Sequence, residues 1–202
     1  MGEDPKFIFT VGCPSIDTLL QAPIMPRERV AEMLKLDPNE PYVLIIQHPV
    51  TTEVDEVGFQ ITQTIEAVKE LGLQGVILYP NNDAGSRVII QGIKNSQISF
   101  LRSLPPDIFA NVLRHSAALI GNSSTGIHET ATFKIPTVNI GSRQQGRERP
   151  KNVIDVGYNK KRIMSGLRKA LYDRGFRQRL RRVKNIYGDG RAAERIVKIL
   201  KK

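Results

Sequence analysis

Short, continuous apolar runs separated by amphipathic stretches constrain the fold of this chain more than any other feature. In Val43-Leu44-Ile45-Ile46 four apolar residues follow one another without alternation, which is typical of a strand buried on both faces. Residues 54–71, 107–115 and 160–172 instead carry apolar residues at helical spacing. Alternating strands and helices predict an α/β fold, a parallel sheet with helices on both faces. We expect strands over residues 7–12, 42–48, 75–80, 98–103, 117–122, 136–141 and 153–157.

The charge is concentrated near the C-terminus of the 202 residues. The net charge is +10, and residues 159–202 hold 16 Lys and Arg against 3 Asp and Glu. These residues include few aromatic side chains that could stack on bases, namely Tyr172, Phe176 and Tyr187, so a solvated helical face, alone or against an acidic partner, is favoured over nucleic-acid binding. No apolar run reaches the roughly 18 residues of a membrane span. The single Cys13 excludes an internal disulfide, and together these features predict a cytoplasmic protein with no membrane partner.

Polar and Gly-rich groups follow several of the expected strands. Ligands of an open parallel sheet bind at the carboxyl ends of its strands, so these groups should converge. They are His48, residues 81–83, Leu104, residues 123–126 and Arg143.

The strongest local signal is Gly121-Asn-Ser-Ser-Thr-Gly126, where a buried strand runs into a Gly/Ser turn and then a helix. Free backbone N–H groups at such a helix start hold phosphate well, but Asn122, Ser123 or Ser124 could serve only as caps. The pattern favours neither the phosphate site nor the helix cap over the other. Glu129, one turn further on, could accept from ribose hydroxyls or merely favour the helix dipole.

The other groups also have two interpretations each. His48 is either a capped loop residue, which is slightly favoured, or a donor to a phosphate or leaving group. Residues 81–86 have the chemistry of a turn. Arg143, Arg147 and Arg149 lie in one loop, and Arg binds pyrophosphate bidentately. A solvated basic loop is the alternative, more so for Arg149 than for Arg143. The sequence carries no Cys/His metal spacing, and no cofactor or metal is expected.

Six ordered motifs carry a family resemblance that covers nearly the whole chain. The motifs are Thr10-Val-Gly-Cys-Pro-Ser-Ile-Asp17, Gln47-His-Pro-Val-Thr-Thr52, Pro80-Asn-Asn-Asp-Ala-Gly-Ser86, Gly121-Asn-Ser-Ser-Thr-Gly-Ile127, Asn139-Ile-Gly-Ser-Arg-Gln144 and Ile186-Tyr-Gly-Asp-Gly190. With these motifs the chain resembles hydrolysing UDP-N-acetylglucosamine 2-epimerases, enzymes of sialic-acid synthesis. This resemblance implies the C-terminal Rossmann-like domain of a glycosyltransferase-B architecture.

The resemblance also implies roles for individual residues. His48 would contact the diphosphate and help UDP depart, by donating a hydrogen bond or by carrying positive charge. Ser123 and Ser124 would hold the pyrophosphate, with Arg143 near the phosphates and Glu129 on the ribose. Asn81 and the backbone near Leu104 would lie around the nucleoside. The family reaction eliminates UDP across C1–C2 of the sugar and then adds water to the glycal.

Members of this family are nearly twice as long as this chain. We therefore expect residues 1–20 to be the hinge or tail of a missing N-terminal domain and residues 21–202 to be the UDP-binding domain. The chain should bind UDP or UDP-N-acetylglucosamine without epimerising alone, and the full-length enzyme should be a homodimer. The last helix, roughly residues 192–202, should lose part of the surface that covers its apolar stripe, and should therefore be frayed or pack against another copy of the chain. The alternatives are the non-hydrolysing branch, a glycosyltransferase-B transferase and a non-catalytic UDP-binding module, with a nucleic-acid-binding domain last.

Overall fold

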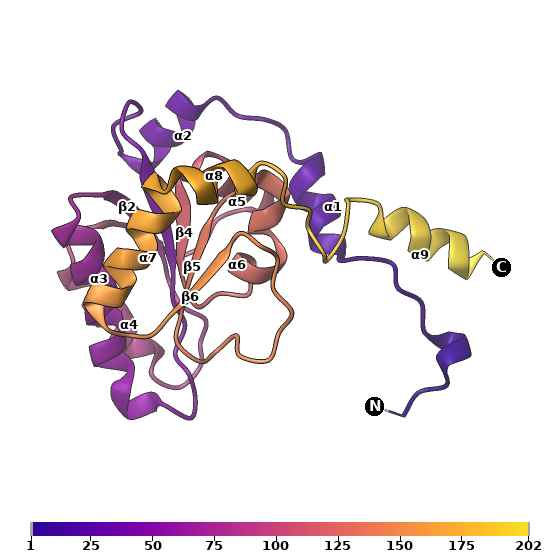
Figure 1. Ribbon diagram of the computed structural model, residues 1–202, viewed down its shortest axis with the longest axis horizontal. Coiled ribbons are helices and arrows are strands. Elements are labelled where there is room, and N and C mark those ends of the chain that lie inside the picture. The colour runs from indigo at the N-terminus through magenta and orange to yellow at the C-terminus, as the bar shows by residue number, and fades with distance from the viewer. Residues whose placement is uncertain (1, 202) are drawn as a thin grey trace.

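Six strands form one parallel sheet in the order β3-β2-β1-β4-β5-β6 (Figure 1). The structure is a computed structural model, and it describes residues 2–201. The order reverses between β1 and β4, so the chain crosses from one half of the sheet to the other at this point. The strands are β1 (Tyr42–Ile46), β2 (Gln74–Leu78), β3 (Ser99–Leu101), β4 (Ala118–Gly121), β5 (Thr137–Ile140) and β6 (Val153–Val156).

Helices cover both faces because alternate residues of each buried strand point to opposite sides. Tyr42, Leu44 and Ile46 pack against α2 (Arg27–Leu34) and α5 (Pro106–His115). Val43 and Ile45 belong to the core on the other face, which is covered by α3 (Val57–Glu70), α4 (Ser86–Asn95) and α7 (Lys160–Tyr172). The continuous apolar runs of the sequence are thus explained by burial on both sides, and the expected α/β fold is confirmed.

The remaining elements are short or lie near the ends of the chain. The short helix α6 (Thr125–His128) follows β4 and continues into the 3-10 helix η3 (Thr130–Phe133), and η2 (Val54–Glu56) leads into α3. The others are η1 (Pro5–Phe7), α1 (Pro14–Gln21), α8 (Arg174–Leu180) and α9 (Ala192–Leu200). None of the helices within residues 2–201 is long and apolar enough to cross a membrane.

The two ends of the chain are joined by Asp17 of α1. Its carboxylate accepts from the backbone N–H groups of Ala192 at 3.1 Å and Ala193 at 2.7 Å, so it caps α9 from 175 residues away. Arg195 of α9 in turn donates to both carboxylate oxygens of Asp189 and to the carbonyl of Val11. The N-terminal segment and α9 therefore project from the same side of the body, beyond α1 (Figure 1).

One prediction at the ends of the chain is wrong. Residues 7–12 form no strand, because an apolar run becomes a strand only beside a free sheet edge, and this segment projects away from the sheet (Figure 1). The last helix begins at Ala192, and its expected end, Lys202, lies outside the described residues. Part of its apolar stripe is uncovered as expected, since Val197 is 48% and Leu200 80% exposed.

Gly121, the last residue of β4, allows the close approach of β1 and β4. Its φ is +130°, and a Cβ there would lie 2.1 Å from the carbonyl oxygen of Ile46. We expect Gly121→Ala to lower the free energy of unfolding by about 3 kcal/mol or more, because clash and backbone strain add. Gly72→Ala is the matched control, since φ is +63° and the space is open there, and should cost about 1–2 kcal/mol. Urea unfolding measures both, and equal losses would contradict the account.

Candidate functional site

The candidate site lies at the carboxyl edge of the sheet, where the strand order reverses between β1 and β4. A crevice opens outside the strands at such a switch point, because the following connections leave toward opposite ends of the sheet. His48 comes two residues after β1 and Asn122 directly after β4. The structure therefore brings together two segments that are 74 residues apart in the sequence.

The side chain of Asn122 holds the backbone of His48 in place. Its Oδ1 accepts from the N–H of His48 at 2.7 Å, and its Nδ2 donates to the carbonyl of His48 at 2.8 Å. The carbonyl of Asn122 accepts from Gln144 Nε2 at 2.8 Å and from Arg143 Nη1 at 3.3 Å. Asn122 is fully buried, so this one residue connects the loops after β1, β4 and β5.

The imidazole of His48 is neutral at pH 7. Its Nδ1 accepts from the backbone N–H of Asn81 at 3.0 Å, which leaves the proton on Nε2. Burial lowers the pKa of His48 to about 4, and the positive charge of Arg143 lowers it further against the opposing charge of Asp83. Of the two expected modes of action, donating a hydrogen bond thus fits the structure, and carrying positive charge at neutral pH does not.

Arg143 and Asp83 line an open cavity of about 590 Å³ beside this histidine, together with Pro49, Val50, Thr51, Thr52, Glu53, Ser142 and Gln145. The side chain of Asn81 donates to Asp83, and this bond connects the loop after β2 to the same cavity. Burial lowers the pKa of Arg143, yet a guanidinium keeps its charge at any ordinary pH. His48, Asn81 and Arg143 are thus brought together, as the carboxyl-edge argument predicts.

The Gly/Ser turn between β4 and α6 has a local hydrogen bond of its own. Ser123 is buried and its Oγ accepts from the N–H of Thr125 at 3.3 Å, while Ser124 is half-buried. Helix α6 ends at His128, so Glu129 lies at its C-cap. A carboxylate favours a helix dipole only near the N-terminus of the helix, and Glu129 lies at the C-terminal end of α6. The alternative in which Glu129 favours the helix dipole is therefore wrong.

Two more residues considered in the sequence make structural contacts of their own. Leu104 is half-buried and packs against the core on the α2/α5 face. Arg149 is not a solvated side chain: it donates to Asp155 at 3.0 Å and to the carbonyls of Arg147 and Gln144. It fastens the loop after β5 to β6.

Sequence reasoning missed two residues that organise this edge. In the sequence Asn122 is recognisable only as a candidate helix cap, and its bonds to His48 cannot be inferred from the local pattern. Glu53 was not singled out, although it accepts from the hydroxyls of Ser142 and Tyr158 and from Gln60. Its place directly after the Gln47–Thr52 motif is the one signal that could have drawn attention to it.

Fold and site together define a Rossmann-like domain of the kind found in glycosyltransferase-B proteins, with its crevice at the β1/β4 switch point. The sequence profile of the UDP-N-acetylglucosamine 2-epimerase family matches residues 1–201. This chain belongs to that family.

Individual relatives agree with this assignment. A "UDP-N,N'-diacetylbacillosamine 2-epimerase (hydrolyzing)" of Legionella pneumophila is 37% identical over 100% of this chain and 53% of its own length. A UDP-N-acetylglucosamine 2-epimerase of Neisseria meningitidis is 32% identical over 84% of this chain and 46% of its own. The S. aureus MnaA–UDP co-structure has a TM-score of 0.76 at 20% identity, covering 99% of this chain and 54% of that one. The chain spans about half the length of the curated relatives it matches.

The burial of neutral His48 makes the free energy of unfolding depend on pH. The folded pKa of about 4 lies below the unfolded value of 6.5, so stability is complete above pH 6.5 and is lost as the pH falls from 6.5 through 4. The loss should reach at most about 3 kcal/mol. Urea unfolding at pH 7 and pH 4.5 should show a smaller pH dependence in His48→Gln than in the natural sequence. An identical dependence in both proteins would contradict a buried neutral imidazole.

Proposed function

We propose that this chain is the UDP-binding half of a hydrolysing UDP-N-acetylglucosamine 2-epimerase. The observation that carries the proposal is the convergence of His48, Asn81 and Arg143 at the β1/β4 switch point, held there by Asn122. The likeness to a hydrolysing epimerase supports the hydrolysing outcome, and the likeness to a UDP co-structure supports the nucleotide. The non-hydrolysing branch remains the alternative for the fate of the sugar.

The site chemistry favours a diphosphate beside His48. Its Nε2–H would donate to a phosphate oxygen, and Arg143 would supply the positive charge that a departing UDP needs. We assign Ser123 and Ser124 to the pyrophosphate and Glu129 to the ribose hydroxyls. Asn81 and the backbone at Leu104 would surround the nucleoside, because they follow β2 and β3 on the same side of the switch point.

The proposed reaction has two steps. In the elimination, the bond between C1 and the β-phosphate oxygen breaks, the proton on C2 leaves, and a glycal and UDP form. Water then adds across the glycal to give N-acetylmannosamine. His48 and Arg143 serve the first step by stabilising negative charge on the departing phosphate. The group that takes the C2 proton would come from the other half of the enzyme.

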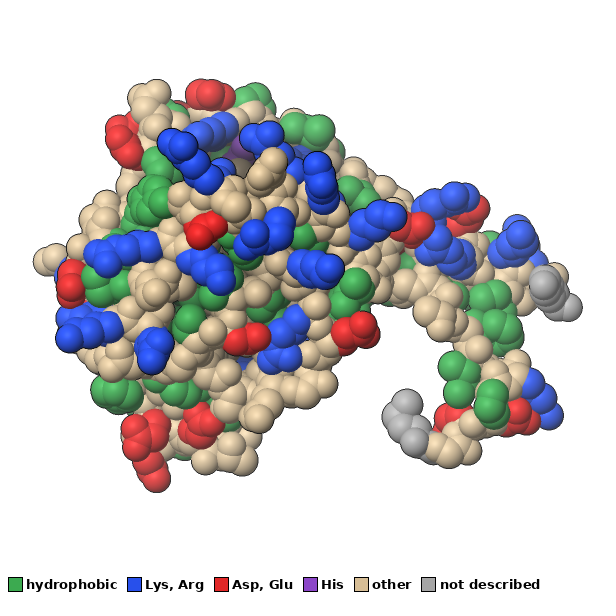
Figure 2. Space-filling model, in the orientation of Figure 1, with side chains coloured by type: hydrophobic (Ala, Val, Ile, Leu, Met, Phe, Trp, Pro, Cys, Tyr) green, Lys and Arg blue, Asp and Glu red, His purple; other side chains and the backbone are tan. Residues whose placement is uncertain are grey.

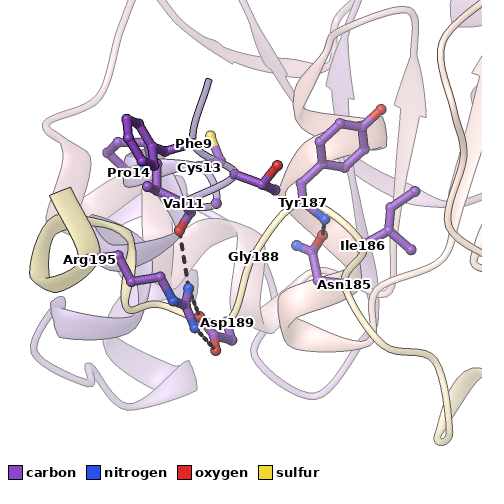
Figure 3. Close-up of a pocket in the computed structure, with 12 residues that line it drawn as sticks. Phe9, Val11, Cys13, Pro14, Asn185, Ile186, Tyr187, Gly188, Asp189 and Arg195 are labelled. Atoms are coloured by element: carbon purple, nitrogen blue, oxygen red, sulfur yellow. Dashed lines mark hydrogen bonds and ion pairs between the residues drawn. The ribbon is translucent and has the colours of Figure 1, made fainter. Parts of the chain in front are cut away.

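The ends of the chain support docking of that other half. Residues 9–14 and 185–189, with Arg195 of α9, line an open groove of about 750 Å³ (Figure 3). Figure 2 shows hydrophobic side chains along the projecting N-terminal segment and α9, where Phe7, Ile8, Phe9, Val197 and Leu200 are exposed. We propose that residues 1–20 and α9 form the connection to an N-terminal domain, and that residues 21–202 form the UDP domain. A homodimer of the full-length enzyme and a cytoplasmic location stay predictions.

A non-catalytic UDP-binding module is the second candidate. A glycosyltransferase-B transferase shares the donor site but would need an acceptor. Nucleic-acid binding ranks last, because Lys and Arg are scattered among other side chains over the face seen in Figure 2.

We expect UDP binding to depend on Arg143. Arg143→Ala should weaken UDP binding by about 1–3 kcal/mol, since a charge-assisted hydrogen bond to phosphate is lost. Arg168→Ala is the charge-matched control, because Arg168 is exposed on α7 and away from the cavity. Isothermal titration calorimetry measures the affinity for UDP in both variants. Equal affinity for UDP in the two variants would contradict the proposed phosphate site.

We also expect Glu129→Ala to weaken UDP binding by about 1–3 kcal/mol through the loss of bonds to the ribose. Uridine as a competitor distinguishes this effect from loss of a phosphate contact, since it keeps the ribose and lacks the phosphates. An unchanged affinity for UDP in a folded variant would give Glu129 a structural role only.

The chain alone should form no N-acetylmannosamine from UDP-N-acetylglucosamine. The reason is that the residues proposed to handle the C2 proton lie outside it. Proton NMR of the sugar follows the reaction directly, and adding the unmatched half of the L. pneumophila relative tests whether turnover can be restored. Formation of N-acetylmannosamine by the 202-residue chain alone would contradict the division of the active site.

A further inference from the structure

Glu53 lies where three separate parts of the chain meet. Its carboxylate accepts from the hydroxyl of Ser142, which follows β5, and from the hydroxyl of Tyr158 at 3.0 Å, which follows β6. A third bond, of 2.7 Å, comes from Gln60 Nε2 on α3. Three donors on one half-buried carboxylate are typical of a group that holds other groups in position.

The loop after β5 is consequently held on both sides of Arg143. Ser142, the residue before it, is fastened to Glu53, and Gln144, the residue after it, is fastened to the carbonyl of Asn122. The same carbonyl receives Arg143 Nη1 at 3.3 Å. The guanidinium is therefore kept at the cavity that Glu53, Asp83 and Arg143 line together.

Tyr158 extends this connection across the end of β5. Gly141 has a φ of +73°, and a Cβ there would lie 2.1 Å from Cζ of Tyr158, so the ring lies directly over the glycine. The position of the ring brings its hydroxyl to Glu53. Burial, and then the hydrogen bond to Glu53, raise the pKa of Tyr158 to about 12, so the hydroxyl remains a donor throughout the ordinary pH range.

The carboxylate stays ionised at neutral pH. The hydrogen bond from Ser142 is the largest cause that lowers the pKa of Glu53, and the bonds from Tyr158 and Gln60 act in the same direction. A carboxylate whose oxygens already accept three bonds is poorly suited to take a proton from a substrate. It is well suited to fix the distance between two loops.

We propose that Glu53 is a positioning residue: it ties the loop after β1 to the loop after β5 and thereby sets Arg143 beside His48. This inference rests on the proposed function, since the site that it organises is the phosphate side of the UDP site. It assigns to Glu53 no contact with the substrate.

The test compares Glu53→Ala and Glu53→Gln with Asp55→Ala in the full 202-residue chain. Asp55 is exposed on the neighbouring η2 and matches the change in charge. Two readouts are used: the NMR titration midpoint of His48, and the affinity for UDP by calorimetry. Glutamine keeps one acceptor oxygen and the shape of the side chain, so its effect should be intermediate.

In Glu53→Ala the midpoint of His48 should rise by about half a pH unit or more, because the charge of Arg143 is no longer held beside it. The affinity for UDP should fall roughly tenfold, the effect of losing one charge-assisted contact. Asp55→Ala should change neither. A role confined to fold stability would lower the melting temperature and leave the His48 midpoint unmoved, and that result would overturn the proposal.

The two proposals can fail separately. If the natural sequence does not bind UDP, the proposed function fails, but a shift of the His48 midpoint in Glu53→Ala still supports the positioning role. If it binds UDP and Glu53→Ala changes neither readout, the positioning role fails alone. Should Glu53→Ala not fold, Tyr158→Phe and Ser142→Ala remove one hydroxyl each, and an unchanged His48 midpoint in both would overturn the proposal.

Discussion

The carboxyl edge of the sheet depends on the buried amide of Asn122. Both of its polar atoms bond to the backbone of His48, and its carbonyl receives the side chains of Arg143 and Gln144. A buried amide that lost these partners would leave polar groups unsatisfied, at about 1–3 kcal/mol each. Through its side chain and its carbonyl together, this one residue therefore holds the loops after β1, β4 and β5 to one another, and the geometry of the site follows from that connection.

The burial of the carboxyl edge of the sheet also determines the protonation of His48. His48 is held neutral, with Nδ1 occupied by the N–H of Asn81, so Nε2–H is its donor. Arg143 stays charged next to it, and Asp83 balances part of that charge. A neutral donor and a fixed guanidinium suit a diphosphate that leaves with additional negative charge, because neither group has to reorganise during the reaction.

How much could be predicted from the sequence differs between fold and site. Apolar runs in the sequence locate the six strands of the sheet, and the continuous run at 43–46 is the direct signature of burial on both faces. The run at 7–12 is also mostly apolar but projects away from the sheet, which the local pattern cannot reveal. His48, Asn81 and Arg143 are found because parallel strands end at one edge. The partners of Asn122 and Glu53 are not, because they lie 74 and 89 residues away along the chain.

The central claim is that UDP binds at the β1/β4 switch point with His48 as a neutral donor. Nitrogen-15 NMR of the histidine rings during a titration with UDP tests it most directly. At pH 7 the free protein should have the proton of His48 on Nε2. UDP should shift this Nε2–H signal together with the side-chain signals of Arg143. The signals of the arginines of α8 should be unaffected. A protonated Nδ1 in the free protein, or shifts confined to α8, would contradict it.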